Sequence, residues 1–152
     1  MHPDYFGNAD EKTRERAQRS TAELNAAFQV LADEFLRADF LVSWLGGPRE
    51  DQERAMPPEF LQEVLEWNEG IEEARSAGPD SAKRAALDPL ERKLRSERSA
   101  LMRKVAETLT PLPQPCARTL TETRKLLNAI RYLDRALGEL AELRLEQSTN
   151  RR

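Results

Sequence analysis

Apolar residues recur at the period of an α-helix along most of the chain. Residues 10–33 place one narrow stripe of apolar or small side chains at spacings of three and four, namely Ala17, Thr21, Leu24, Phe28 and Leu31. A second, shorter helix is predicted over residues 34–45, with Asp33 as its N-cap. Its apolar positions are dense enough that it must pack against another element.

Three longer helices are predicted after the breakers Gly46, Gly47 and Pro48. The first begins at Pro58, a residue that suits a first helical turn, and Gly78 and Pro79 end it. The second covers residues 80–109, where Asp88 and Pro89 indicate either a kink or a fresh start. Prolines in the stretch 110–117 separate it from a last helix over about 119–147. We therefore expect an all-α protein in which these three helices form an antiparallel bundle.

Some bulky side chains lie off the apolar stripes of these helices. On a helical wheel Leu61 and Leu65 fall beside an acidic row that contains Glu66, Glu69 and Glu73. On the last helix Tyr132 points about 140° away from the apolar stripe. An acidic row is ordinarily a solvated face, and a lone tyrosine is ordinarily one exposed aromatic ring. The two tryptophans, Trp44 and Trp67, follow their apolar stripes and are expected in the core.

Composition narrows the function classes. The chain has 152 residues, 39% of them hydrophobic and 34% charged, which fits one domain or two small ones. A net charge of -3 argues against a general nucleic-acid binder, so protein partners are expected instead. No apolar run approaches the roughly 18 residues of a membrane span, and the N-terminus shows no targeting pattern. We expect no membrane association and a cytoplasmic location.

Candidate chemistry is sparse. Cys116 and His2 are the only cysteine and histidine, so we expect neither an internal disulfide nor a multi-ligand zinc site. A carboxylate metal site on the third helix would be expected to use histidines at a spacing of three, and none follows its glutamates. Cys116 has no histidine base nearby in sequence. The sequence therefore predicts no enzyme activity, no metal and no cofactor.

The residues His2, Pro3 and Asp4 form a charged segment whose proline restricts the backbone. Such a segment normally lies between two secondary-structure elements, but here only Met1 precedes it. Taken alone, it reads as a frayed chain end.

Four segments in this order resemble the HscB family of J-domain co-chaperones: "HPD", "RADFLVSWLGG", "FLQEVLEWNEGIEEA" and "AIRYLDRALGELAEL". The resemblance implies co-chaperones that deliver an IscU-type iron-sulfur scaffold to a heat-shock ATPase of the HscA or DnaK type. It implies a J-domain whose HPD loop docks on the ATPase, here His2, Pro3 and Asp4. It also implies a C-terminal bundle that binds the scaffold through Leu61, Leu65, Glu66, Glu69, Glu73 and Tyr132.

On this basis we expect an incomplete J-domain over residues 1–46, a linker over 47–57, a three-helix bundle over 58–147 and a disordered tail over 148–152. Three positions depart from the family pattern, which favours an apolar residue at Gln62, a basic one at Asn68 and an acid at Gly70. A misassigned start at Met1 would account for the missing first helices, and in-frame codons upstream would reveal it. We expect the chain as written to bind the scaffold without stimulating the ATPase. The alternative is a degenerate adaptor that has lost chaperone coupling altogether.

Overall fold

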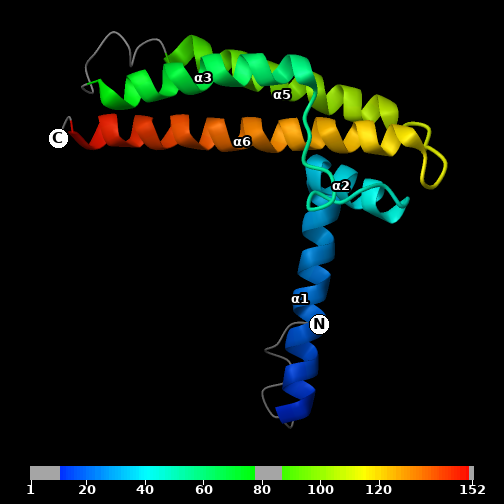
Figure 1. Cartoon of the computed structure of the whole chain (residues 1–152). Coiled ribbons are helices and arrows are strands. Elements are labelled where there is room, and N and C mark those ends of the chain that lie inside the picture. The colour runs from blue at the N-terminus through cyan, green and yellow to red at the C-terminus, as the bar shows by residue number, and fades with distance from the viewer. Residues whose placement is uncertain (1–10, 78–86, 151–152) are drawn as a thin grey trace. The chain divides into compact units, whose positions relative to one another are not determined.

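The computed structural model describes residues 11–77 and 87–150, which form five helices and no strand (Figure 1). The predicted all-α class is confirmed. By its internal contacts the chain divides into two compact units, Met1–Leu41 and Val42–Arg152. This division falls inside the second helix, ahead of the linker that we expected over residues 47–57. The HPD segment at residues 2–4 and the predicted helix end at residues 78 and 79 lie outside the described residues.

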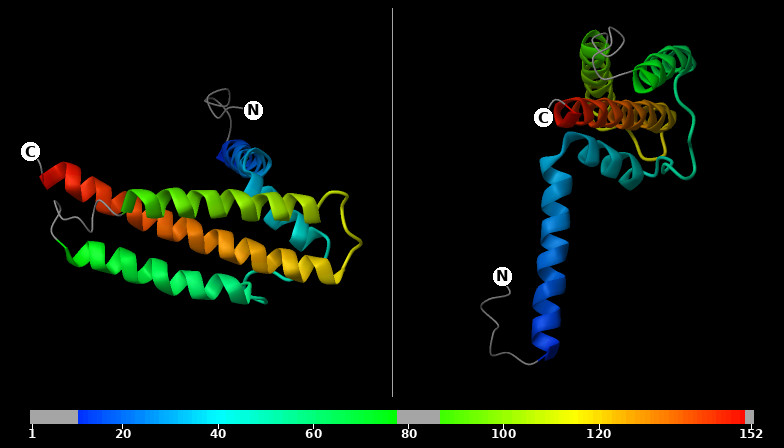
Figure 2. Two further views of the ribbon diagram at one scale, coloured as in Figure 1. Left: turned by 90° about the horizontal axis from the view of Figure 1, so that it is seen from above. Right: turned by 90° about the vertical axis from the view of Figure 1, so that its left-hand side faces the viewer.

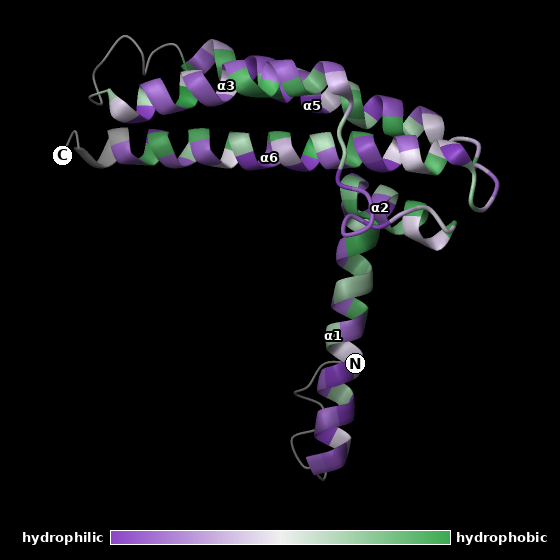
Figure 3. Cartoon of the chain, viewed as in Figure 1, coloured by the Kyte–Doolittle hydropathy of each residue, from purple (hydrophilic) through white to green (hydrophobic). Residues whose placement is uncertain are grey.

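The first unit contains helix α1, Glu11–Ala32, and most of α2, Glu34–Trp44. Asp33 separates them, and its Oδ1 accepts a hydrogen bond of 2.9 Å from the backbone N–H of Leu36. The predicted N-cap is therefore confirmed. Apolar residues of α1 gather in its C-terminal half, whereas its N-terminal half is hydrophilic (Figure 3).

The large apolar residues of the predicted α1 stripe are exposed, whereas Ala17 at its start is buried. Leu24, Phe28 and Leu31 are 64%, 68% and 67% exposed. Leu31 also lines a hollow of about 370 Å³ between α1 and α2, together with Ala27, Val30, Arg37, Phe40 and Leu41. Folded monomers rarely leave so many large apolar side chains together in solvent, so this surface is a feature that needs an explanation.

The second unit is a bundle of α3, Pro58–Ser76, α5, Leu87–Thr108, and α6, Arg118–Asn150. Each of the three helices contacts the other two, and successive helices run in opposite directions (Figures 1 and 2). The predicted antiparallel three-helix bundle is thus confirmed. Asp88 and Pro89 lie in the first turn of α5, and residues 80–86 of the predicted helix are outside the described part.

Helix α6 runs further than the sequence led us to expect. It continues to Asn150, so residues 148–150 are helical and do not belong to the disordered tail that we predicted. The last two residues, 151 and 152, lie outside the described part. A polar sequence with no glycine or proline contains no signal that stops a helix, and the preceding buried turns have already nucleated it.

The bundle core is built from the predicted apolar stripes. Trp67 is only 2% exposed, and its ring meets that of Phe60 edge-to-face with centroids 5.4 Å apart. Leu94, Leu127, Ile130 and Leu133 are fully buried. Burying each such side chain stabilises the fold by about 1.5–3 kcal/mol before entropy is counted.

The prediction that Trp44 is a core residue is wrong, because its side chain is 67% exposed. The buried residues of α2 and the turn after it are Phe35, Ala38, Val42 and Leu45, which share one side of the helix. Trp44 lies about 140° from the centre of that side on a helical wheel. Helix α2 is apolar on both sides, so its sequence pattern does not reveal which side is buried.

The connection before α3 is held by polar side chains of α6. The Nε of Arg124 donates to the carbonyl oxygen of Pro48 at 2.8 Å. The Nδ2 of Asn128 donates to the carbonyl oxygens of Glu53 and Ala55 at 2.8 and 2.9 Å. Arg131 forms an ion pair with Glu50. These three side chains lie one helical turn apart, so one stripe of α6 fixes the path of the chain into α3.

Candidate protein-docking surface

Helix α3 presents two leucines to solvent. Pro58 stands in its first turn, and Phe60, Val64, Trp67, Ile71 and Ala74 are buried on its inner side. These five residues fix the rotation of the helix, so Leu61 and Leu65 must face outward. They are 46% and 66% exposed, as their position off the apolar stripe predicted.

Exposed carboxylates accompany the leucines on the same outward side. Glu66, Glu69 and Glu73 are all exposed. Glu66 and Glu69 form no ion pair within the described part of the chain, whereas neighbouring Glu63 lies 3.4 Å from the Nζ of Lys93. Two negative charges are thus available to a partner, and their mutual repulsion favours one that brings positive charge.

Tyr132 joins this side from α6. Its ring packs edge-to-face on Phe60 with centroids 6.2 Å apart. Its hydroxyl donates to Oδ1 of Asn68 at 3.1 Å and accepts from Nδ2 of Asn68 at 2.7 Å. Asn68 follows Leu61 and Leu65 on the same row of α3, so the tyrosine lies at the end of the leucine row.

We call Leu61, Leu65, Glu66, Glu69, Glu73 and Tyr132 the leucine-glutamate face. Tyr132 is half-buried, and so it is not the freely exposed ring that its wheel position suggested. The wheel could not show this, because the partner of Tyr132 is Asn68, which lies 64 positions away in sequence. No pattern in the sequence predicts the contact between Asn68 and Tyr132.

Residues 11–77 and 87–150 contain no group of three or more histidine, cysteine, aspartate or glutamate side chains placed to hold a metal ion. Within the same ranges, none of the helices has the length and apolar character needed to cross a membrane. The candidate docking residues His2, Pro3 and Asp4 lie outside the described part, so the structure does not relate them to the leucine-glutamate face.

Comparison with known proteins assigns the family. Residues 56–141 match the domain family described as the HSCB C-terminal oligomerisation domain, which is more than half of the chain. The chain is also 30% identical over 139 residues to the co-chaperone protein HscB homolog of Vibrio vulnificus strain YJ016, a match that covers 90% of this chain and 81% of that protein. The chain belongs to the HscB co-chaperone family.

Two other HscB homologs match shorter stretches. The protein from Azoarcus sp. strain BH72 is 38% identical over 79 residues, which cover 51% of this chain and 45% of that protein. The protein from Ralstonia nicotianae is 35% identical over 109 residues, covering 71% of this chain and 60% of that protein. The chain thus spans less than two thirds of the length of each of these two relatives. No solved structure matches it.

The HscB resemblance of the sequence is therefore confirmed. All residues of the leucine-glutamate face lie within the matched residues 56–141.

Proposed function

We propose that this chain is a co-chaperone of iron-sulfur cluster assembly that binds an IscU-type scaffold through the leucine-glutamate face and brings it to an HscA- or DnaK-type ATPase. One observation carries the proposal. Two large leucines are exposed on an otherwise acidic side of α3, next to Tyr132, within the domain that the chain shares with the HscB family.

The leucines supply most of the expected affinity. Complete removal of each from water contributes about 1.5–3 kcal/mol. Glu66 and Glu69 are exposed, so their charges mainly set the orientation and the rate of association toward a basic patch on the scaffold. Tyr132 adds an aromatic anchor that Asn68 and Phe60 already hold in place, which lowers the entropy lost on binding.

Titration calorimetry with the IscU-type scaffold encoded by the same genome tests the proposal. Leu61→Ala together with Leu65→Ala should weaken binding by about 2–4 kcal/mol, because two exposed anchors lose their contacts while the bundle core is untouched. Leu112→Ala is the matched control, since Leu112 is 52% exposed but lies in the loop between α5 and α6.

The control should bind as the unmodified chain does. Unchanged affinity of the double leucine variant, with helicity and melting temperature preserved, rules out the leucine-glutamate face as the scaffold site.

A further inference from the structure

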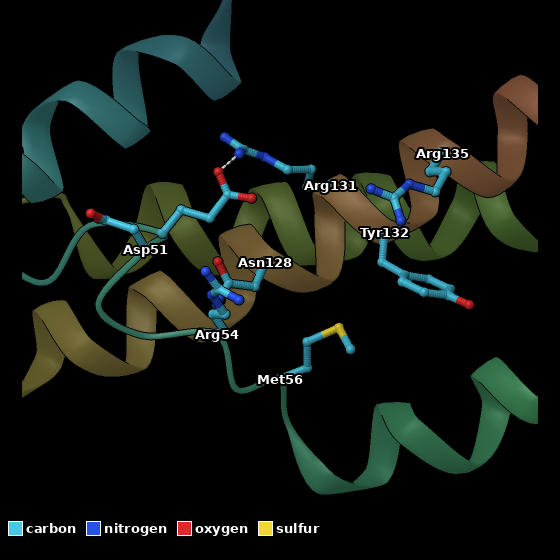
Figure 4. A pocket seen from close by; sticks show the side chains of 8 residues that line it. Asp51, Arg54, Met56, Asn128, Arg131, Tyr132 and Arg135 are labelled. Carbon is cyan, nitrogen blue, oxygen red and sulfur yellow. Dashed lines mark ion pairs between the residues drawn. The ribbon is translucent and has the colours of Figure 1, made fainter.

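A second surface meets the leucine-glutamate face at Tyr132. It is a hollow of about 580 Å³ in the second unit, between the connection that leads into α3 and helix α6. Figure 4 shows Arg131, Tyr132 and Arg135 projecting from α6, and Arg54 and Met56 projecting from the connection. Tyr132 therefore belongs to both surfaces, so one bound protein can reach both of them.

Positive charge dominates the lining of this hollow. Three guanidinium groups, of Arg54, Arg131 and Arg135, stand against two carboxylates, of Glu50 and Asp51. Both carboxylates already have partners. Glu50 forms an ion pair with Arg131 (Figure 4), and Oδ2 of Asp51 lies 3.1 Å from Nη2 of Arg49. Arg54 and Arg135 form no ion pair or hydrogen bond within the described part of the chain. Two guanidinium groups are thus available to a ligand.

Arg135 lies on the side of α6 that faces the connection. Arg124, Asn128 and Arg131 form a stripe one turn apart, and each binds the connection. Arg135 is the next member of the same stripe, but it holds nothing among the described residues. An exposed arginine that forms no hydrogen bond or ion pair among the described residues is available for recognition.

We propose that this hollow binds the carboxylate of an aspartate or glutamate side chain on the scaffold that docks on α3. The inference rests on the proposed function and adds a second contact to it. Guanidinium groups bind a carboxylate with two parallel hydrogen bonds, and the side chains of Arg54 and Arg135 both line the hollow. A carboxylate fits better than a doubly charged phosphate, because the carboxylates of Glu50 and Asp51 lie in the same lining.

The recognition surface then carries opposite charges on the two sides of Tyr132. Its α3 side is acidic and its α6 side is basic, so a partner must present a basic patch and an acidic side chain in the matching order. A partner turned end for end would meet like charge on both sides. The arrangement thereby fixes orientation, which the two leucines cannot do alone.

The experiment uses the full chain and the purified IscU-type scaffold, with calorimetry for affinity and stopped-flow fluorescence for association. Arg54→Gln with Arg135→Gln should weaken binding about tenfold and slow association, since two exposed charge-assisted contacts are lost. Arg54→Lys with Arg135→Lys keeps the positive charge but removes the planar guanidinium group that forms two parallel hydrogen bonds, so it should give a smaller loss of affinity. Arg103→Gln on α5 makes the same type of change at another exposed arginine and should have no effect.

A charge exchange identifies the ligand group. Arg135→Glu should bind poorly to the native scaffold, and replacing one acidic scaffold residue with arginine should restore at least part of the affinity. Failure of every such acidic replacement to restore binding would overturn the assignment of a carboxylate. If Arg54→Gln with Arg135→Gln binds the scaffold within twofold of the unmodified chain, while Leu61→Ala with Leu65→Ala still weakens binding, the hollow is not a contact. If the leucine pair also binds normally, the docking face itself is wrong and this inference falls with it.

Discussion

Gly47 stands where the backbone leaves no room for a side chain. A Cβ atom there would lie 2.8 Å from the carbonyl oxygen and Cγ1 of Val42 and from Cβ of Leu120. A backbone oxygen and the Cβ of a fully buried leucine cannot swing aside as the end of a long side chain can. Gly47→Ala should therefore lower the free energy of unfolding by about 1–3 kcal/mol.

Urea denaturation followed by circular dichroism measures this effect, with Gly138→Ala as the matched control. Nothing lies within 4 Å of a Cβ at Gly138, which is in the middle of α6. That substitution should stabilise the protein by about 0.5–1 kcal/mol through helix propensity alone. Equal effects of the two substitutions would mean that Gly47 is not sterically required.

Asn128 shows how a single side chain of an element can order a loop. Its Nδ2 donates to the carbonyl oxygens of Glu53 and Ala55. Asn128→Ala removes both hydrogen bonds, each with a net contribution of about 0.5–1.5 kcal/mol. The connection should open more often, and trypsin should cut after Arg49 and Arg54 about fivefold faster or more.

Timed digestion with mass spectrometry reads out the cleavage at each arginine. Asn25→Ala, at an exposed asparagine of α1, provides the control and should leave these rates unchanged. If Asn128→Ala is cleaved at the same rate as the unmodified chain, Asn128 does not hold the connection in place.

The bundle helices were predictable because each buries one stripe at helical spacing, as Phe60, Val64 and Trp67 do on α3. The outward leucines of the docking face followed from the same wheel. Contacts between elements were not predictable in this way. The orientation of Trp44 depends on which side of an apolar helix is covered, and the polar stripe of Arg124, Asn128 and Arg131 depends on where a distant loop passes. A helical wheel of α6 drawn for its polar residues would have revealed the stripe, but not the residues of the connection that it binds.

At the scale of the whole molecule, the two units bear different parts of the proposed function. The bundle carries the leucine-glutamate face, and the first unit exposes Leu24, Phe28 and Leu31 on α1. In the resembled J-domain, the helix before HPD packs against the helix after it and supplies basic residues to the ATPase. The exposed row on α1 has the apolar character of such a packing surface. From the sequence we expect the 152 residues as written to bind the scaffold without stimulating ATP hydrolysis.

Single-turnover hydrolysis by the partner chaperone, with and without scaffold, tests that prediction. On that expectation, the rate equals that of the chaperone alone. A chain that carries two J-domain helices ahead of His2 is the positive control. Full stimulation by the present chain, lost in Asp4→Asn, would show that the loop acts without those helices.

The unequal burial of the two tryptophans has an optical consequence. Trp67 is 2% exposed inside the bundle and Trp44 is 67% exposed. Their emission should differ in wavelength, and a water-soluble quencher such as acrylamide should reach the indole of Trp44 while that of Trp67 stays shielded. A Trp44→Phe chain would then carry a single tryptophan, Trp67, which is two positions from Leu65 and adjacent to Asn68 on α3. Its emission would report the opening of the bundle without an attached dye.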